Sequence, residues 1–240
     1  MRRLLSAFAV LLLGTMLGFA REPSVPFGWQ EDPPRNPVLL VPGWLGHAQD
    51  LSPLKERLVR DGWEEEWVFP VEFQDPVGSS IDHAKELDQA LEAVLADTGA
   101  RNVDIVAHSM GGLAVWVLLQ GEGSDLPVSR VVFLATPFQG TLTAYLAWGE
   151  GGPEMIPGSD LLERLQQGGW PQQWADVLSI RTPLDLTVVP SYQTTMVEMG
   201  DRVICCPTHQ GLLDHEETYL VIREFLLGRK TQDLPASSGL

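Results

Sequence analysis

The sequence predicts an α/β fold, with a mostly parallel central sheet and helices on both of its faces. Short runs of apolar, often β-branched residues alternate with longer apolar or amphipathic segments, and strand and helix alternate three times before residue 136. Such alternation is typical of parallel strands joined by crossover helices. The chain has 240 residues, which is enough for one domain of this class with a large core and too few for two.

The first twenty residues predict a secretory signal peptide rather than a part of the fold. A pair of arginines starts the segment, an apolar stretch runs from Leu4 to Gly18, and Gly18 and Ala20 are the small residues that a signal peptidase recognises. The alternative is an uncleaved anchor, although the stretch is shorter than the ~20 residues of a comfortable membrane span. We therefore expect a secreted or periplasmic protein cleaved near Ala20, with residues 21–36 as an extended lead-in.

The charge of the chain restricts its partners. The formal net charge is −16, and removal of the signal peptide makes it more negative because that segment carries two arginines and no acidic residue. A surface this acidic opposes binding to nucleic acid and to anionic membranes. We expect no nucleic-acid partner, and a preference for neutral substrates.

The predicted domain covers residues 37–228 and begins with a buried strand over residues 37–41. A tight loop follows, Pro42-Gly43-Trp44-Leu45-Gly46. Ser52 and Pro53 are suited to the N-cap and the first position of a helix over residues 52–60.

Another strand and a long helix come next. Alternating apolar residues over 66–73 predict the strand. The apolar stripe of residues 81–97 repeats every 3.6 residues and predicts an amphipathic helix. Ser79 or Ser80 is expected to cap this helix, and Gly99 to end it.

A serine then lies between a predicted strand, residues 103–107, and a predicted helix, residues 113–120. The sequence here is Ala107-His108-Ser109-Met110-Gly111-Gly112. Small residues two positions on either side of a serine, at a strand-to-helix turn, form the nucleophile-elbow pattern. The turn raises the hydroxyl above the sheet, and the N–H of Met110 can face a developing oxyanion at the helix N-terminus. The alternative is a tight turn with an incidental serine.

After a strand over residues 130–135, the alternation is interrupted by residues 136–176. This insertion follows the Thr136-Pro137 turn and is rich in glycine, proline and large apolar residues. A long insertion of this kind is often functional, so a lid or the wall of a substrate cleft is one interpretation. The other is ordinary packing of two short helices on the sheet. The candidate substrate contacts are Phe138, Leu142, Leu146 and Trp148.

The last part of the chain supplies two strands and a closing helix. The strands are predicted over residues 177–180 and 202–206. Asp214 is expected to cap a helix that runs to Leu227, with Glu217 completing a capping box. Residues 229–240 are expected to form a flexible tail.

Three residues have the types and the order needed for nucleophilic catalysis. A serine nucleophile needs a base that takes its proton and a carboxylate that orients the base. In enzymes with a nucleophile elbow the order along the chain is serine, acid, histidine. Ser109, Asp185 and His209 follow this order, and each comes after a predicted strand.

Other candidates for these roles remain. Asp160, Asp176 and Asp201 are alternative acids, whereas Asp214 is too close to His209 in sequence. His108 is interpreted as structural, with its side chain directed away from Ser109. Cys205 and Cys206 are the only cysteines, and two buried thiols are the simplest interpretation because a bond between neighbours closes a strained ring. A vicinal redox switch or a zinc site is the alternative.

These motifs resemble those of the α/β-hydrolase superfamily, and within it the small bacterial secreted lipases and esterases. The resemblance extends from about Pro37 to Leu227 and depends on five segments. They are residues 41–46, residues 107–112, Ala135-Thr136-Pro137-Phe138-Gln139-Gly140, Pro183-Leu184-Asp185, and His209-Gln210-Gly211-Leu212-Leu213. The family often has His-Gly where this chain has Pro42-Gly43.

The resemblance implies a role for each site residue. Ser109 is expected to be the nucleophile, His209 the general base and then acid, and Asp185 the orienting carboxylate. The oxyanion hole is expected to consist of the backbone N–H groups of Met110 and Trp44, with Leu45 as a possible donor.

The expected function is hydrolysis of carboxylic esters of neutral lipids through an acyl-enzyme intermediate. No cofactor and no metal are expected, the substrate is a small-molecule or lipid ester, and transient contact with a lipid interface is possible. A monomer is favoured. An acyltransferase or thioesterase would use the same three residues, and a non-catalytic lipid-binding protein on this fold is the alternative from another functional class.

Overall fold

A computed structural model describes residues 35–122, 126–195, 200–230 and 233. The predicted signal peptide, residues 21–34 of the lead-in and most of the predicted tail lie outside the described residues. Among the residues that are described, no helix combines the length and apolarity that crossing a membrane requires.

Six parallel strands form one sheet, in the order β2-β1-β3-β4-β5-β6. The strands are β1 (Val38–Val41), β2 (Val68–Pro70), β3 (Val103–His108), β4 (Val128–Leu134), β5 (Asp176–Arg181) and β6 (Gly200–Val203). The chain leaves β1 towards β2 and then returns to the other side of β1 to form β3. Ligands in open α/β sheets bind where the strand order reverses in this way, at the carboxyl ends of the strands. The topology thus favours a site next to the ends of β1 and β3.

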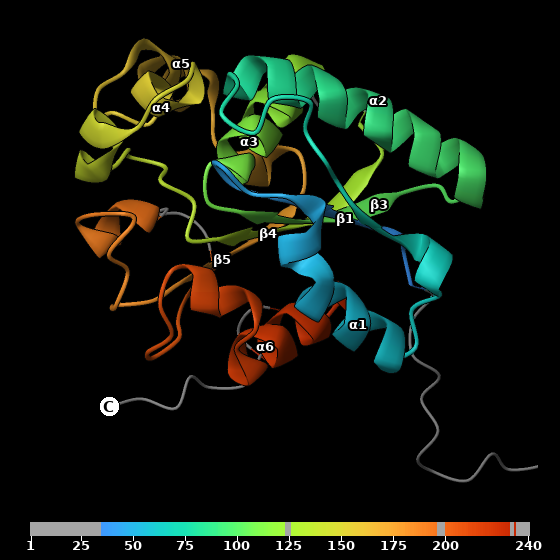
Figure 1. Cartoon of the computed structure of the whole chain (residues 1–240). Coiled ribbons are helices and arrows are strands. Elements are labelled where there is room, and N and C mark those ends of the chain that lie inside the picture. Colours follow the sequence, from blue (N-terminus) through green and yellow to red (C-terminus); the bar gives the residue numbers. More distant parts are fainter. Residues whose placement is uncertain (1–34, 123–125, 196–199, 231–232, 234–240) are drawn as a thin grey trace, which may run out of the picture. The chain divides into compact units, whose positions relative to one another are not determined.

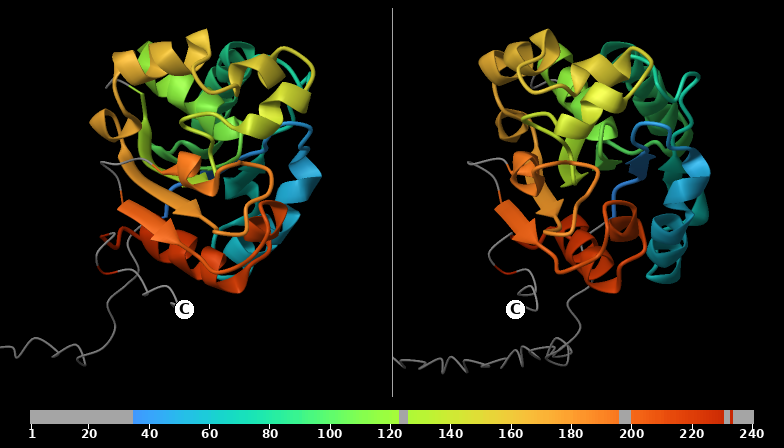
Figure 2. Two further views of the ribbon diagram at one scale, coloured as in Figure 1. Left: turned by 90° about the vertical axis from the view of Figure 1, so that its left-hand side faces the viewer. Right: turned by 60° about the vertical axis from the view of Figure 1, so that its left-hand side comes forward.

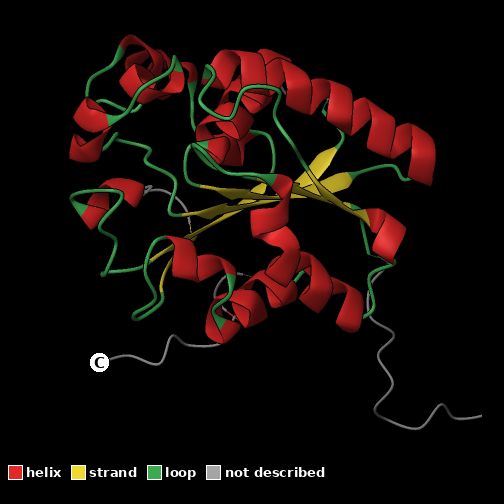
Figure 3. Ribbon diagram, viewed as in Figure 1, coloured by secondary structure: helices red, strands yellow, loops and turns green. Residues whose placement is uncertain are grey.

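Helices cover both faces of the sheet, as predicted. Helices α2 (Ser80–Thr98) and α3 (Gly111–Glu122) lie on one face, and α1 (Ser52–Arg60) and α6 (Glu216–Leu226) lie on the other (Figures 1 and 3). Successive strand residues supply both cores: Leu39 packs with the α2 and α3 side chains, and Leu40 packs with those of α1 and α6. Strands buried on both faces are expected to be mostly apolar, which explains the apolar runs of residues 38–41 in β1, 105–107 in β3 and 131–134 in β4.

The start of helix α2 is as predicted, whereas those of α1 and α6 differ. Ser79 caps α2 through its hydroxyl, which accepts the N–H of Ile81 (3.1 Å). Ser52 does not cap α1, because a 3-10 turn, Ala48–Leu51, runs directly into the helix. The prediction that Asp214 caps α6 is also wrong. Its carboxylate binds Arg57 of α1 (3.0 Å), and the helix begins one residue after His215.

Two predicted strands are shorter in the structure. Only Val68–Pro70 of the predicted strand 66–73 pairs in the sheet, and Glu65–Trp67 forms a 3-10 turn before it. Val71 and Phe73 are apolar because they pack in the core against α2. The last strand, β6, ends at Val203, before the two cysteines.

The insertion contains the short helices α4 (Gly151–Glu154) and α5 (Asp160–Gly168), and its second half packs as core. Figure 2 shows α4 and α5 beside α3, on the side of the sheet opposite α6. Leu161, Leu162 and Leu165 are buried there. The carboxylate of Glu154 accepts bonds from the Ser79 hydroxyl and the Ser80 N–H, both at 2.7 Å. Glu154 therefore fastens α4 to the N-terminus of α2.

The two cysteines differ from their prediction as buried thiols. Cys205 and Cys206 are joined by a disulfide bond, and both are partly exposed. They lie between β6 and His209.

Candidate active site

Ser109 occupies a sharp turn between β3 and α3. Its φ is 53°, in the left-handed region that non-glycine residues rarely adopt. Glycines allow the neighbouring backbone to approach. A Cβ atom on Gly111 would lie 2.1 Å from the carbonyl oxygen of Pro42, and one on Gly43 would lie 2.7 Å from the Cβ of Ser109. The loop after β1 is thus pressed against the turn that presents the serine hydroxyl.

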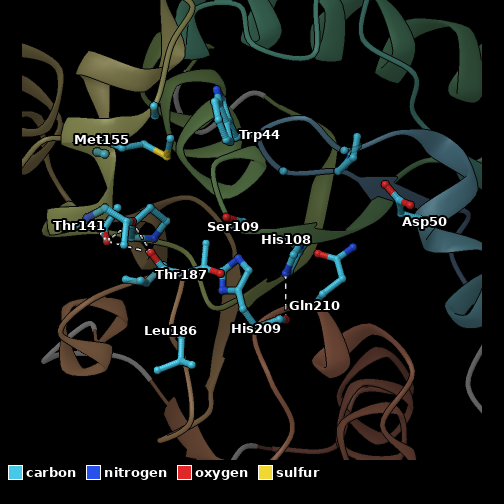
Figure 4. A pocket seen from close by; sticks show the side chains of 18 of the residues that line it. Trp44, Asp50, His108, Ser109, Thr141, Met155, Leu186, Thr187, His209 and Gln210 are labelled. Atoms are coloured by element: carbon cyan, nitrogen blue, oxygen red, sulfur yellow. Dashed lines mark hydrogen bonds between the residues drawn. The ribbon is translucent and has the colours of Figure 1, made fainter.

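A cavity of about 410 Å³ opens beside Ser109, over the carboxyl ends of the strands. Residues from five separate segments line it: the loop after β1, the end of β3, the first half of the insertion, the loop after β5 and the loop after β6. Those that bear on the chemistry include Trp44, Ser109, Leu186 and His209 (Figure 4). Leu146 and Trp148 of the insertion also line the cavity. The cavity lies where the reversal of strand order favours a ligand site.

His209 and Asp185 form a buried hydrogen bond beside this cavity. His209 Nδ1 lies 2.7 Å from Asp185 Oδ2, and the residues are 6% and 4% exposed. The carboxylate can only accept, so Nδ1 carries the proton and Nε2 is left as an acceptor. The other carboxylate oxygen, Oδ1, accepts the backbone N–H groups of Thr187 (2.9 Å) and Val188 (2.7 Å). These bonds fix the orientation of the His209 ring and the position of the Asp185 carboxylate that faces it.

The structure thus brings Ser109 and His209 to one cavity, with Asp185 bonded to His209 behind it, and separates the alternative acids from the cavity. Asp201 pairs with Arg181 (3.0 Å), and Asp176 is exposed at the start of β5. Asp160 begins α5 in the insertion. Ser109 Oγ and His209, both described, form no hydrogen bond with each other; such catalytic contacts often tighten only when the substrate is bound.

The candidate oxyanion donors lie in the loop after β1 and at the start of α3. The N–H of Leu45 donates to the carbonyl of Pro76 (2.9 Å). That bond removes Leu45 from the set of possible donors. Trp44 and Met110 remain, and Gly43 places the Trp44 peptide next to Ser109.

His108 differs in part from its prediction. It makes a structural contact, but its side chain lines the same cavity as Ser109 instead of pointing away from it. Its Nε2 lies 3.2 Å from the carbonyl oxygen of His209, so this nitrogen carries the proton and donates it. Burial, and then the neighbouring His209, lower the pKa of His108 well below its usual range. A neutral His108 therefore holds the backbone of His209.

Two of the four candidate substrate contacts are not at the cavity. Phe138 is fully buried among Trp116, Phe133 and Trp170, so its assignment to the cleft is wrong. Leu142 is 53% exposed but does not line the cavity. Leu146 and Trp148 do line it. The indole N–H of Trp44 donates to the carbonyl of Trp148 (3.1 Å), which connects the loop after β1 to the insertion.

Two threonines that the sequence did not single out support the loops of the site. The hydroxyl of Thr182 donates to the carbonyl of Pro207 (2.6 Å) and so joins the loop of Asp185 to that of His209. Thr141, at the start of the insertion, binds the backbone at Thr187 and Val189. A single buried threonine has no sequence signature, so only the structure reveals these contacts. No group of three His, Cys, Asp or Glu side chains suited to a metal is present among the described residues.

Comparisons with known proteins show which proteins this chain is similar to. A family model described as class 2 lipase matches residues 35–148, the part that contains Ser109 but not Asp185 or His209. The mature lipase BlEst2 of Bacillus licheniformis has a similar structure, with a TM-score of 0.69 and 16% identity over 81% of this chain and 93% of that one. The monoacylglycerol lipase of Paleococcus ferrophilus has a TM-score of 0.59 and 19% identity, over 80% of this chain and 93% of that one.

A third neighbour is longer. Phospholipase PlaB of Legionella pneumophila has a TM-score of 0.52 and 20% identity, over 60% of this chain and 37% of that one. This chain matches well under half the length of that phospholipase. At such low identities the likeness establishes the fold. The chain therefore has the α/β-hydrolase fold of these lipases, and the class 2 lipase model matches just under half of its sequence.

Proposed function

We propose that this protein is a serine ester hydrolase that cleaves carboxylic esters of neutral lipids through an acyl-enzyme intermediate. The class 2 lipase match and the hydrolase fold support an ester hydrolase. The observation that carries the serine mechanism is the buried bond of 2.7 Å between His209 Nδ1 and Asp185 Oδ2, beside the cavity that Ser109 lines. That bond leaves His209 Nε2 free to accept a proton.

The proposed reaction has two halves. In the first, Ser109 Oγ attacks the ester carbonyl carbon while His209 Nε2 takes the hydroxyl proton. The N–H groups of Trp44 and Met110 stabilise the oxyanion, each contributing about 3–4 kcal/mol to lowering the barrier. The intermediate collapses, His209 returns the proton to the departing alkoxide, and the acyl group stays on Ser109. In the second half, water takes the place of the alcohol and the same steps release the acid.

The walls of the cavity favour an apolar acyl group. Ala144, Leu146, Trp148 and Met155 of the insertion form one side. Large apolar side chains are also exposed around the opening, among them Leu146 (85%), Leu186 (81%) and Trp148 (60%). Exposed apolar clusters of this kind mark ligand grooves or interaction surfaces. They support a lipid ester as substrate and transient contact with a lipid interface.

The experiment that tests the function is hydrolysis of p-nitrophenyl esters from acetate to palmitate by purified protein. Ser109→Ala is the control, together with covalent labelling by a fluorophosphonate. Turnover and labelling that both disappear in Ser109→Ala are expected. Labelling that survives this substitution would contradict the nucleophile, and silence of the wild type across all esters would favour thioester or acyl-transfer substrates.

Variants of the other two residues separate their roles. We expect His209→Ala to lower kcat by at least about 10⁴-fold, because no other group can take the serine proton. Asp185→Asn is expected to cost orders of magnitude by permitting the wrong tautomer of His209. Thermal unfolding of both variants checks that the fold is kept. Near-normal activity of Asp185→Asn would show that another group orients His209.

A further inference from the structure

The loop that carries Asp185 receives little support from burial. It follows β5 without regular secondary structure, and the side chains around Asp185 face solvent. Leu184 is 52% exposed and Leu186 is 81% exposed, whereas Asp185 and Val188 are buried. The position of the carboxylate must therefore depend on specific hydrogen bonds.

One peptide group is central to these bonds. The N–H of the peptide between Thr187 and Val188 donates to Asp185 Oδ1 at 2.7 Å. The carbonyl oxygen of the same peptide accepts the buried hydroxyl of Thr141 at 3.0 Å and the partly exposed hydroxyl of Thr143 at 2.5 Å. Because a peptide group is planar, fixing its carbonyl fixes the direction of its N–H. The hydroxyl of Thr141, together with that of Thr143, thus holds the orientation in which this peptide meets the carboxylate.

Thr141 also holds the next peptide of the loop. Its hydroxyl oxygen accepts the N–H of Val189 at 2.9 Å, and the N–H of Leu142 donates to the carbonyl of Val189 at 2.9 Å. Thr141 is only 3% exposed. A single buried atom therefore acts as donor to one peptide and as acceptor from the other, which a hydroxyl can do and a methyl group cannot.

We infer that Thr141 is a positioning residue for catalysis, whose hydroxyl orients the Thr187–Val188 peptide so that Asp185 Oδ2 stays directed at His209. This inference rests on the proposed function, in which Asp185 orients the base. It gives a role to the start of the insertion, directly after the Thr136-Pro137 turn. The segment that begins at Thr141 and bears the apolar wall at Leu146 and Trp148 also supports the acid.

The test compares Thr141→Val with Thr141→Ser and with Thr194→Val. Valine keeps the shape of threonine but lacks the hydroxyl, and serine keeps the hydroxyl. Thr194 is a matched control, because it is 1% exposed in the same loop and, within the described part of the chain, its hydroxyl bonds only to the carbonyl of Ser191. On p-nitrophenyl acetate we expect Thr141→Val to lower kcat about tenfold with little change in KM. Thr141→Ser and Thr194→Val should match the wild type.

Two further measurements separate positioning from general loss of structure. The low-field proton NMR signal of His209 Nδ1–H, assigned by its absence in His209→Ala, should weaken or move in Thr141→Val and persist in the control. This signal reports on the Asp185 bond even if no ester is turned over, so failure of the proposed function is distinguishable. In an Asp185→Asn background, Thr141→Val should cost nothing more, because both changes act through one bond.

Several results would overturn the inference. They are wild-type kcat and an unchanged proton signal in Thr141→Val, an equal loss of kcat in the Asp185→Asn background, or a loss in Thr141→Ser as large as that in Thr141→Val. If Thr141→Val does not fold, Thr141→Ser decides: an intact signal and kcat support the hydroxyl, and their loss contradicts it.

Discussion

At the scale of single residues, the site depends on backbone positions that tolerate no larger side chain. Ser109 holds a left-handed φ of 53°, a conformation that costs a non-glycine residue of order 1 kcal/mol or more. The cost persists only where the surroundings leave the chain no alternative. Here the loop after β1 and the first turn of α3 enclose Ser109 through Gly43 and Gly111.

Gly111→Ala tests this enclosure, with Gly121→Ala in the same helix as its control. The added methyl at Gly111 would lie 2.1 Å from the Pro42 oxygen, whereas nothing lies within 4 Å at Gly121. We expect Gly111→Ala to destabilise the fold by at least about 2 kcal/mol and to abolish turnover. Gly121→Ala should stabilise by about 0.5–1 kcal/mol, because alanine is the better helix former. Urea unfolding measures both, and equal stabilities would contradict the close approach.

At the scale of elements, the spacing of apolar residues in the sequence predicts which side chains are buried in the core. Helix α2 was predictable because its apolar stripe coincides with a serine cap and a terminal glycine, and the structure keeps all three. The strand predicted over 66–73 was too long, because alternation records burial and not sheet pairing. Phe138 shows the same limit, since an apolar side chain serves a core and a cleft equally well. The order of serine, acid and histidine predicted the pairing of Asp185 with His209. The hydrogen bonds from Thr141 and Thr182 to the loops of the site could not be predicted, because they join residues distant in sequence.

The first half of the insertion offers a matched pair for testing the acyl wall. Leu146 and Leu142 belong to one 3-10 segment and are both exposed, but only Leu146 lines the cavity. We expect Leu146→Ala to lower kcat/KM for octanoate by roughly 5- to 30-fold relative to acetate, which corresponds to about 1–2 kcal/mol of lost apolar contact. Leu142→Ala should leave this ratio unchanged. Equal effects of both variants would place the acyl chain elsewhere.

At the scale of the whole molecule, the two ends of the sheet carry different kinds of polar group. The carboxyl ends carry the site, whereas a buried charge lies near the amino end of β3. Asp104 is fully buried and is bonded to Asn36 (3.0 Å) and to Arg130 (3.4 Å). Burial raises the pKa of its carboxyl to about 6, although both partners oppose the shift. The folded domain therefore holds a proton at Asp104 more tightly than the unfolded chain does.

This difference predicts how stability depends on pH. Because the pKa is raised on folding, the contribution of Asp104 is fully present below about pH 4 and is lost as the pH rises through about 6. Asp104→Asn removes this titration. We therefore expect the free energy of unfolding of the variant to rise relative to that of the wild type by up to about 3 kcal/mol between pH 4 and pH 7. Any constant cost of the lost Arg130 partner cancels in this comparison.

Asp61→Asn provides a control of opposite sign. Burial opposes ionisation of Asp61, but hydrogen bonds from Arg60 and Tyr219 outweigh it and lower its pKa. Its contribution to stability is therefore present at neutral pH and lost in acid. The free energy of unfolding of Asp61→Asn should accordingly decrease relative to that of the wild type as the pH rises out of the acid range. Urea unfolding of Asp104→Asn and the wild type from pH 4 to pH 7 measures the first trend. The trend of Asp61→Asn is measured by the same method below about pH 4, because its pKa lies below the ordinary value of a carboxyl group. A difference in free energy of unfolding between Asp104→Asn and the wild type that does not change with pH would mean that Asp104 keeps its ordinary pKa in the fold. Burial of the charged carboxylate at the amino end of β3 would then cost no free energy.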